Sequence, residues 1–365
     1  MDLPNPFTPT FGRIPPYFAG RKTLLGNMRR ALQRGPEDPN LTSILIGARG
    51  TGKTALLSAI AREAQAAGWI TARVSAGAGM LQDILERTAE SGSELIDSSP
   101  SLRLKDLSVG QTFGIEFDRA YRPEGNWRTC MNGLLKQLEP YGTGLLITVD
   151  EVLADVDEMK QLASVYQHFI EEDKNVALVM AGLPANVSQL VSDKSVSFLR
   201  RARQHHLGRI DGPDIETALR RTIVERGATI DDPAVLEAVA AIDGFPYMMQ
   251  LVGYWTWEEA SSRNIGLPDV LNGIRLATQE LRDGVLATTY RELSKGDMRF
   301  LEAMLPDGQP SSLADISARM GVGSNYASKY KERLIDAGVL GDVGQGFYSI
   351  DLPGFRDYVR ERAER

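Results

Sequence analysis

The chain has 365 residues, of which 42% are hydrophobic and 24% are charged, and its formal net charge at pH 7 is −7. This length exceeds the usual size of one domain and predicts two or three. The negative net charge excludes a general polycation, so contact with nucleic acid requires a local basic patch. The single cysteine, Cys130, excludes an internal disulfide and a cysteine-rich zinc site.

Targeting signals are not evident in the sequence. The N-terminus has no basic segment followed by an apolar run, so we expect no signal peptide. No stretch of about 18 apolar residues is present, so we expect no membrane-spanning helix and no membrane partner. The low cysteine content suits a reducing cytosol, and we expect a cytoplasmic protein.

The predicted elements of the first 210 residues alternate between strand and helix. Residues 1–20 are rich in proline and glycine and predict an extended arm, followed by a helix over 21–34. Alternation between strands and helices predicts a mostly parallel sheet with helices on both faces, an α/β class. Residues 102–117 suggest a hairpin. The predicted strands are 41–46, 69–74, 145–149 and 176–181, and the predicted helices are 53–67, 81–90, 127–138 and 158–171.

Beyond residue 211 the pattern becomes helical, with no strand expected before residue 290. Helices are predicted at 213–226, 233–241, 247–262 and within 267–290. The tail predicts helices at 295–304, 313–319 and 324–337, then short strands at 339–340 and 346–350, which is a winged-helix pattern. We therefore divide the chain into an arm (1–20), an α/β core (21–210), a helical lid and linker (211–290) and a winged-helix domain (291–365).

A phosphate-binding loop is the most specific motif. The octet from Gly47 to Thr54 matches G-x-x-x-x-G-K-[S/T] between an apolar strand and a helix. Glycines let backbone N–H groups face the phosphates, Lys53 reaches the β- and γ-phosphates, and Thr54 ligates Mg²⁺. We expect ATP or ADP with Mg²⁺; the alternative is a glycine-rich turn without a ligand. The predicted nucleotide-binding residues of this segment are Gly47, Gly50, Thr51, Gly52, Lys53, Thr54 and Ala55.

Two carboxylates follow the predicted strand at 145–149. Ligands bind at the carboxyl ends of strands in open α/β sheets. Asp150 is therefore predicted to hold Mg²⁺ together with Thr54, and Glu151 to orient and polarise the attacking water as the catalytic base beside Lys53. The alternative is an ordinary strand end with surface acids.

These motifs, in this order, resemble the AAA+ P-loop ATPases of the origin-recognition and STAND type. The segment Phe18-Ala19-Gly20-Arg21 is similar to that family's GR segment, and Gly244-Phe245-Pro246 to its GxP motif. The resemblance implies that Gly20 and Arg21 lie against the adenine and that Pro246 approaches the nucleotide. It also implies an ATPase core with a lid and a winged helix.

The resemblance has two departures. The strand at 176–181 ends in Ala181-Gly182, where many relatives carry a polar sensor, and Asn186 is the nearest candidate. No sensor arginine accompanies the GxP motif. Hydrolysis, including slow hydrolysis, and binding without turnover both stay open.

Arg200 and Arg201 follow the sensor strand, where the family places an arginine finger. A guanidinium there could reach the γ-phosphate of a neighbouring subunit and would imply a homo-oligomer. The equal alternative is a solvated or salt-bridged basic helix end.

The predicted helix at 324–337 is the DNA-recognition element that the resemblance implies. Asparagine can read adenine, and Lys or Arg can contact phosphate or guanine. However, residues 291–365 contain 11 Lys/Arg and 12 Asp/Glu, a net charge of −1, and phosphate neutralisation supplies most non-specific affinity. The candidate DNA-binding residues are Asn325, Tyr326, Ser328, Lys329, Lys331 and Arg333.

Two functions follow. The first is a DNA-associated AAA+ ATPase whose nucleotide state controls how the winged helix contacts double-stranded DNA, in replication, mobile-element control or defence. The second is a STAND-like nucleotide switch whose winged helix contacts an unknown protein partner, with slow or no hydrolysis.

Overall fold

The computed structural model describes residues 3–10, 12–96, 123–308 and 310–364. The hairpin predicted at 102–117 lies outside these ranges. None of the helices within them is long and apolar enough to cross a membrane.

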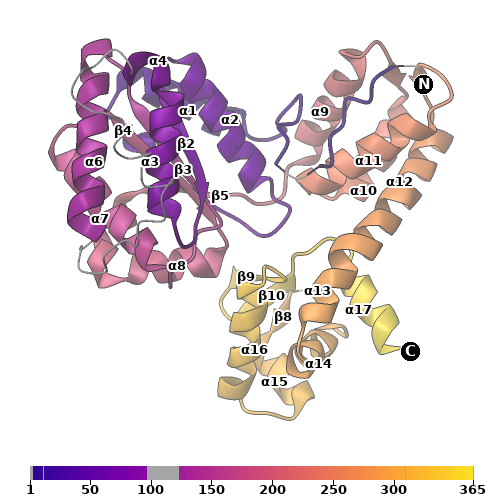
Figure 1. Cartoon of the computed structure of the whole chain (residues 1–365). Helices are drawn as coiled ribbons and strands as arrows, with labels where there is room; N and C mark the ends of the chain where they lie inside the picture. Colours follow the sequence, from indigo (N-terminus) through magenta and orange to yellow (C-terminus); the bar gives the residue numbers. More distant parts are fainter. Residues whose placement is uncertain (1–2, 11, 97–122, 309, 365) are drawn as a thin grey trace, which may run out of the picture.

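The core is a five-stranded parallel sheet in the order β2-β3-β4-β1-β5 (Figure 1). Four strands fall where the apolar runs predict them, because central strands of a parallel sheet are buried on both faces. The strands are β1 (Thr42–Ile46), β2 (Ile70–Ser75), β3 (Leu145–Asp150), β4 (Val176–Gly182) and β5 (Arg203–His206).

Helices cover both faces of this sheet, as predicted. The helices α1 (Lys22–Arg34) and α2 (Lys53–Ala66) pack on one face, and α3 (Met80–Ser91), α6 (Pro123–Leu138) and α7 (Asp157–Glu171) on the other. Short segments complete the core: η1 (Pro39–Leu41), α4 (Ser93–Ile96), η2 (Glu139–Tyr141), α8 (Pro184–Ser192) and η3 (Lys194–Arg201).

The edge strand β5 was not expected from the sequence. Its residues Arg203-Gln204-His205-His206 carry no apolar alternation, and three of the four side chains are exposed. An edge strand has one neighbour, so its residues need not be apolar. Pairing with β1 alone holds it in the sheet.

The lid region contains α9 (Gly212–Val224), α10 (Asp232–Ile242), α11 (Pro246–Glu259) and α12 (Leu267–Leu281). The expectation of no strands here is wrong, because β6 (Thr229–Ile230) pairs in parallel with β7 (Asn264–Ile265). Two-residue strands are too short to give a periodic signal.

The C-terminal region, residues 287–364, continues from α12 through a π-helical turn, η4 (Arg282–Leu286). Its three-stranded antiparallel sheet has the order β8-β10-β9. The three predicted helices and two predicted strands are present, whereas β8 and α17 were not expected. The elements are α13 (Ala287–Glu292), α14 (Lys295–Met304), β8 (Ser311–Ser312), α15 (Leu313–Met320), α16 (Ser324–Asp336), β9 (Leu340–Gly344), β10 (Phe347–Ile350) and α17 (Phe355–Ala363).

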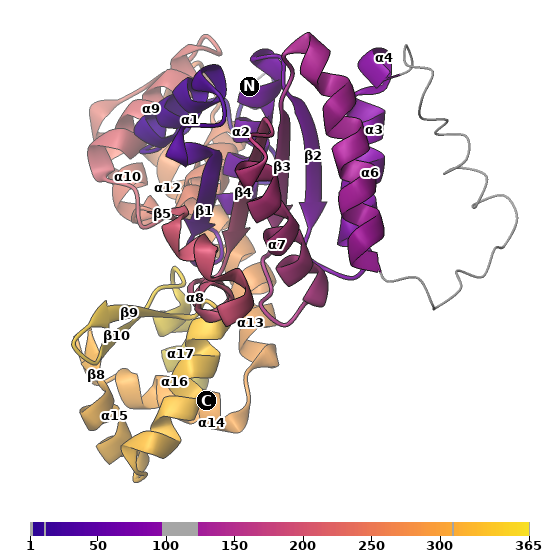
Figure 2. The ribbon, with the colours of Figure 1, turned by 90° about the vertical axis from the view of Figure 1, so that its left-hand side faces the viewer.

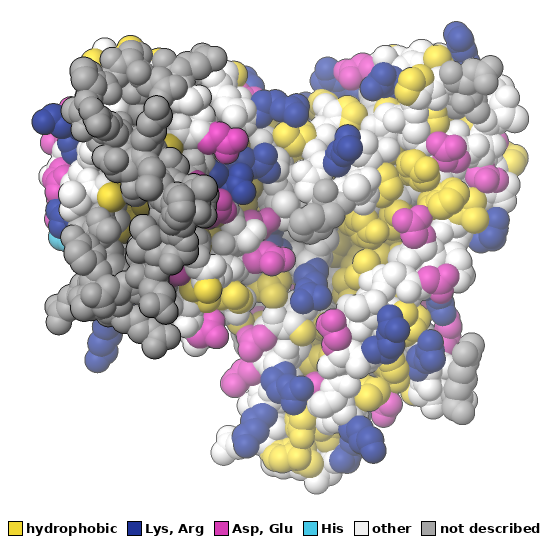
Figure 3. All heavy atoms as spheres, viewed as in Figure 1, with side chains coloured by type: hydrophobic (Ala, Val, Ile, Leu, Met, Phe, Trp, Pro, Cys, Tyr) yellow, Lys and Arg dark blue, Asp and Glu magenta, His cyan; other side chains and the backbone are white. Residues whose placement is uncertain are grey.

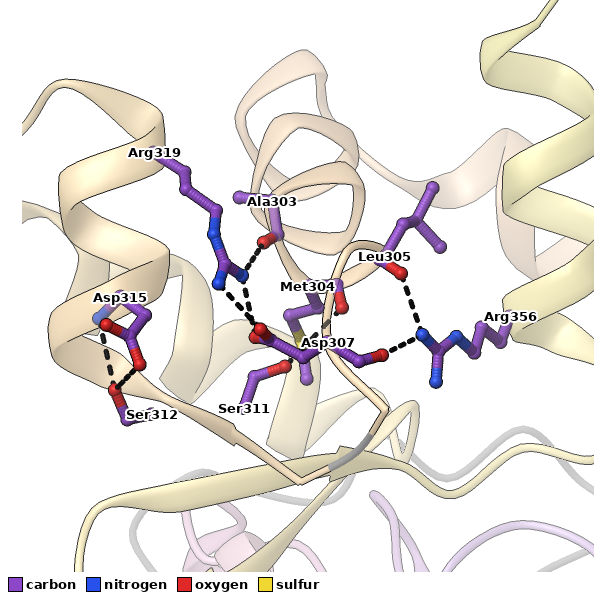
Figure 4. Close-up of polar contacts among 9 residues, drawn as sticks. All are labelled: Ala303, Met304, Leu305, Asp307, Ser311, Ser312, Asp315, Arg319 and Arg356. Atoms are coloured by element: carbon purple, nitrogen blue, oxygen red, sulfur yellow. Dashed lines mark hydrogen bonds and ion pairs between the residues drawn. The ribbon is translucent and has the colours of Figure 1, made fainter.

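Two arginines fasten the turn that follows α14 (Figure 4). Arg319 of α15 donates to both carboxylate oxygens of Asp307, at 2.6 Å each, and to the carbonyl of Ala303 at 2.7 Å. Arg356 of α17 donates to the carbonyl oxygens of Leu305 and Asp307. These bonds join α14, α15 and α17.

One long helix links the lid to the C-terminal region, and the C-terminal region contacts the core. In Figure 1, α12 runs from the lid down to the C-terminal region. Figure 2 shows α8 between the sheet and the C-terminal region, and α16 contacts α8.

Candidate nucleotide-binding site

The loop after β1 can only be built with glycine at key positions. A Cβ at Gly47 would lie 2.6 Å from Thr51 Oγ1 and 2.9 Å from the Leu207 carbonyl oxygen. Gly50 and Gly52 have φ of +81° and +85°, which favour glycine. The close turn leads directly into α2, whose N-terminus attracts anions.

The Lys53 side chain turns back into the loop that precedes it. Its Nζ donates to the carbonyl oxygens of Gly47 and Ala48, both at 2.8 Å. Burial lowers the pKa of Lys53 to about 8, although the nearby carboxylates of Asp150 and Glu151 oppose this shift. A lysine held by carbonyl oxygens, with no ion-pair partner among the described residues, fits a phosphate-binding role.

Thr54 and Asp150 meet although they are 96 positions apart. Thr54 Oγ1 donates to Asp150 Oδ2 at 2.6 Å, because α2 begins beside the carboxyl end of β3. Hydroxyl and carboxylate oxygens are the hard ligands that Mg²⁺ takes alongside substrate phosphates. The donor set therefore fits a magnesium ion, which Thr54 and Asp150 would hold.

Glu151 adopts an uncommon backbone conformation for a non-glycine residue, with φ of +54°. Its backbone N–H donates to Asp150 Oδ1 at 2.9 Å, and its side chain is exposed. Thr54, Asp150 and Glu151 line a cavity of about 590 Å³ that extends along β2 past Arg73. The Glu151 carboxylate therefore has room for a water molecule beside Thr54 and Asp150.

The lid reaches the phosphate-binding loop through the predicted GxP segment. A Cβ at Gly52 would lie 3.7 Å from Pro246 Cβ, and one at Gly50 would lie 3.7 Å from Tyr247 Cβ. The tertiary structure thus brings residues 246–247 to the loop at 50–52.

Gly20 and Arg21 lie at the junction of core and lid. A Cβ at Gly20 would lie 3.1 Å from Ile210 Cγ2. Arg21 donates to the Gly208 carbonyl oxygen at 2.8 Å, and burial lowers the pKa of its guanidinium. The backbone of Leu207, the preceding residue, donates to Ile46 at the end of β1, so this segment adjoins the loop.

The end of β4 explains the missing sensor side chain. A Cβ at Gly182 would lie 3.0 Å from Val187 Cγ2 and 3.1 Å from Val152 Cβ. Apolar groups fill the place where a polar side chain would stand. Asn186, the nearest candidate, lies in α8 and is half-buried.

The two finger candidates differ in their surroundings. Arg200 donates to the carbonyl oxygens of Val191 and Ser192, at 2.9 and 3.2 Å, and so caps the C-terminus of α8. Arg201 is exposed and has no polar partner among the described residues. Of the two candidates, Arg201 is therefore the one whose guanidinium is not engaged by the described residues.

The candidate DNA-binding residues on α16 also divide into two groups. Arg333 pairs with the buried carboxylate of Asp297 at 3.0 Å, and Lys331 lies over the Tyr348 ring. Asn325, Tyr326 and Lys329 are exposed, and Ser328 is half-buried. The Tyr326 hydroxyl accepts a hydrogen bond from Tyr330 at 2.8 Å. The C-terminal half of the helix is thus engaged within the chain.

Sequence reasoning missed Arg49, a variable position of the loop. A Cβ at Gly338 would lie 3.4 Å from the Arg49 backbone nitrogen and 3.3 Å from Leu183 Cδ2. Arg49 lines a pocket of about 80 Å³ together with Glu292, Asp297 and other residues of the C-terminal region. No local sequence pattern indicates this contact, because it joins residues almost 300 positions apart.

Comparison with known proteins supports the fold. Residues 283–359 match a family described as a domain of unknown function (DUF8462). No curated protein matches the chain. A Walker-type ATPase of Pyrococcus abyssi has a TM-score of 0.64 at 15% identity, covering 94% of this chain and 96% of that one. The ORC2 protein of Aeropyrum pernix, solved as ADPNP and ADP complexes, has a TM-score of 0.62 at 14% identity, covering 98% of each chain. The chain therefore has the fold of the AAA+ P-loop NTPases.

Proposed function

We propose that this protein is a Mg²⁺-dependent ATP-binding switch that hydrolyses ATP slowly and signals nucleotide occupancy through its C-terminal winged-helix domain. The contact between Thr54 and Asp150 carries the nucleotide part of the proposal, because it joins the loop and the acidic strand end in the arrangement that a magnesium–phosphate complex requires. ATPase neighbours share the fold and support this class.

The residues divide the work as follows. Lys53 exchanges two carbonyl partners for phosphate oxygens, and the N–H groups from Gly50 to Thr54 face the phosphates. Thr54 and Asp150 hold Mg²⁺, which supplies charge neutralisation on the phosphates when bound. Glu151 orients a water and accepts its proton. The apolar end of β4 offers no further polar group, which favours slow turnover.

The packing of the C-terminal region on the loop favours a switch. Gly338 lies against Arg49, and α16 lies against α8. A change in the loop on phosphate binding would therefore reach this interface directly. A domain that contacts the phosphate-binding loop can change position when the nucleotide changes.

DNA association is the second candidate function. It is favoured by Asn325 and Lys329, which lie one turn apart on the exposed part of α16. Against it, Lys331 and Arg333 already have partners within the chain, and Lys/Arg and Asp/Glu side chains are interspersed over the C-terminal region in the view of Figure 3. A protein partner fits this mixed surface better than a polyanion does.

The experiment is to measure nucleotide binding and turnover with and without duplex DNA at two salt concentrations. We expect Lys53→Ala to abolish nucleotide binding. DNA should change turnover little if the switch reading is correct. A steeply salt-dependent stimulation by DNA would instead support the second candidate.

Glu151→Gln tests the catalytic base. We expect ATP hydrolysis to fall by about 10²-fold or more, while nucleotide affinity is retained. Asp155→Asn is the matched control, since Asp155 is an exposed carboxylate four residues away. Equal hydrolysis rates for the two variants would show that Glu151 is not the catalytic base.

A further inference from the structure

The N-terminal arm is attached to the lid. The Trp257 indole donates to the Leu3 carbonyl oxygen at 3.2 Å, and the Thr8 backbone N–H donates to Gln250 Oε1 at 3.0 Å. Asn5 donates to the Tyr254 carbonyl oxygen at 3.1 Å. These partners all lie on α11, the helix that begins at the GxP proline.

Phe7 is the apolar anchor of this attachment. Its side chain is 2% exposed. It occupies a notch that exists because residue 253 is glycine: a Cβ there would lie 2.3 Å from Phe7 Cδ1. A mid-helix glycine costs helix stability relative to alanine, so the notch is a packing requirement.

The arm then passes from the lid to the core, close to Thr54. A Cβ at Gly12 would lie 3.6 Å from Thr54 Cγ2. Further along, Tyr17 lies beneath Lys22 of α1 and Arg221 of α9. Figure 1 shows the indigo arm running from the lid to the core. The arm therefore spans the space between lid and core and passes next to the threonine assigned to Mg²⁺.

Arg13 follows Gly12 at this crossing. It is exposed, and it has no ion-pair partner among the residues that the structure describes. Asp150 and Glu151 lie near Lys53, and Arg73 and Arg87 line the same cavity as the two carboxylates. A bound triphosphate adds further negative charge there, so a further cation beside it is stabilised.

We propose that Arg13 binds the terminal phosphate of the triphosphate, and that the arm presents it only while Phe7 is anchored on the lid. The inference rests on the proposed nucleotide function and adds a residue that separates ATP from ADP. Because the anchor is on α11, the same contact ties lid position to the presence of the γ-phosphate.

The test measures the affinities of fluorescent ADP and of a fluorescent, non-hydrolysable imido analogue of ATP, with Mg²⁺, on the full chain. We expect Arg13→Ala to weaken the triphosphate about tenfold and ADP less than twofold, since the added bond is charge-assisted. Arg62→Ala is the matched control, an exposed arginine on α2. Loss of affinity for both nucleotides alike, or no loss for either, would overturn the proposal.

Variants of the anchor provide the second arm of the experiment. Gly253→Ala expels Phe7 and should give the same triphosphate-selective loss as Arg13→Ala. Gly26→Ala is its control, because a Cβ at that helical glycine would lie no closer than 4.0 Å to a neighbour, the flexible Arg30 Nη1. Phe7→Ala removes the anchor without a clash. If Gly253→Ala does not fold, Phe7→Ala tests whether the anchor is needed for triphosphate affinity. Full triphosphate affinity in Phe7→Ala would contradict the proposal that the arm must be anchored on the lid to present Arg13.

Lys53→Ala separates this proposal from the one on which it rests. If that variant still binds both nucleotides, the proposed function fails. If Lys53→Ala binds neither nucleotide, while Arg13→Ala keeps the natural ratio of triphosphate to ADP affinity, only the role of Arg13 fails.

Discussion

At the residue scale, the position of Lys53 makes nucleotide binding sensitive to pH. The free protein holds its pKa at about 8, chiefly because of burial, whereas phosphate binding requires and stabilises the charged amine. Below pH 8 the amine is already protonated, so affinity should be constant there. Above pH 8 binding must take up a proton, and affinity should fall by up to about tenfold per pH unit.

Isothermal titration with ADP between pH 7 and 9.5 measures this dependence. Lys53→Arg is the control, because an arginine stays charged over the range and should give a flat profile. A flat profile for the natural protein would show that Lys53 does not titrate in this range.

At the element scale, the two arginines at the end of η3 are expected to differ in effect. Arg200 satisfies carbonyl groups at the end of α8, so Arg200→Ala should lower thermal stability. Arg201→Ala should leave stability unchanged and lower turnover by about tenfold or more, if a neighbour uses it as an arginine finger.

Turnover per molecule measured against protein concentration tests this directly. A finger supplied by another copy makes the natural protein's specific activity rise with concentration. Concentration-independent activity, together with an unaltered Arg201→Ala rate, would leave Arg201 as a surface residue.

The polar cluster in Figure 4 gives a second prediction at the element scale. The bidentate bond from Arg319 holds the pKa of Asp307 at about 2, below the ordinary value near 3.9. A depressed pKa contributes stability that is complete above the unfolded value and disappears as the pH falls towards 2. Asp307→Asn should therefore lower the melting temperature by about 2–4 °C at pH 7.

Calorimetry from pH 7 to pH 3 checks the sign. The difference between the natural protein and Asp307→Asn should be constant down to about pH 5 and shrink below pH 4. A difference that grows on acidification would contradict the assignment.

At the scale of the whole molecule, the contact of Gly338 with the phosphate-binding loop predicts coupling between its two partners. Gly338→Ala places a Cβ 3.3 Å from Leu183 and 3.4 Å from Arg49, and should strain the contact between the C-terminal region and the core. Gly321→Ala is the matched control, since both glycines have φ of +68° but nothing lies within 4 Å of a Cβ at Gly321. Both variants carry about 1–2 kcal/mol of backbone strain.

Hydrogen exchange of residues 47–54 measures the effect on the loop. We expect faster exchange in Gly338→Ala than in Gly321→Ala, because only the first strains the interface. Equal exchange in the two variants would mean that the loop does not sense the C-terminal region.

The sequence by itself determined the elements whose signals are local. The octet from Gly47 to Thr54 is a recognisable motif, and the short apolar runs at 145–149 and 176–181 have the length and composition of buried strands. The parallel α/β class followed from their alternation. Strand β5, the two-residue pair β6 and β7, and helix α17 were missed, because edge pairing and packing rather than periodicity define them.

Only the tertiary structure decided which of these residues meet. Thr54 contacts Asp150 because the parallel strands β1 and β3, which have β4 between them, end at the same edge of the sheet. Arg49 contacts Gly338, and Gly12 approaches Thr54, through chain segments that no local pattern connects. The same packing assigned Arg333 to Asp297 and left Arg201 exposed. A sequence specifies local conformation residue by residue, whereas contacts between distant residues depend on how all of the elements pack together.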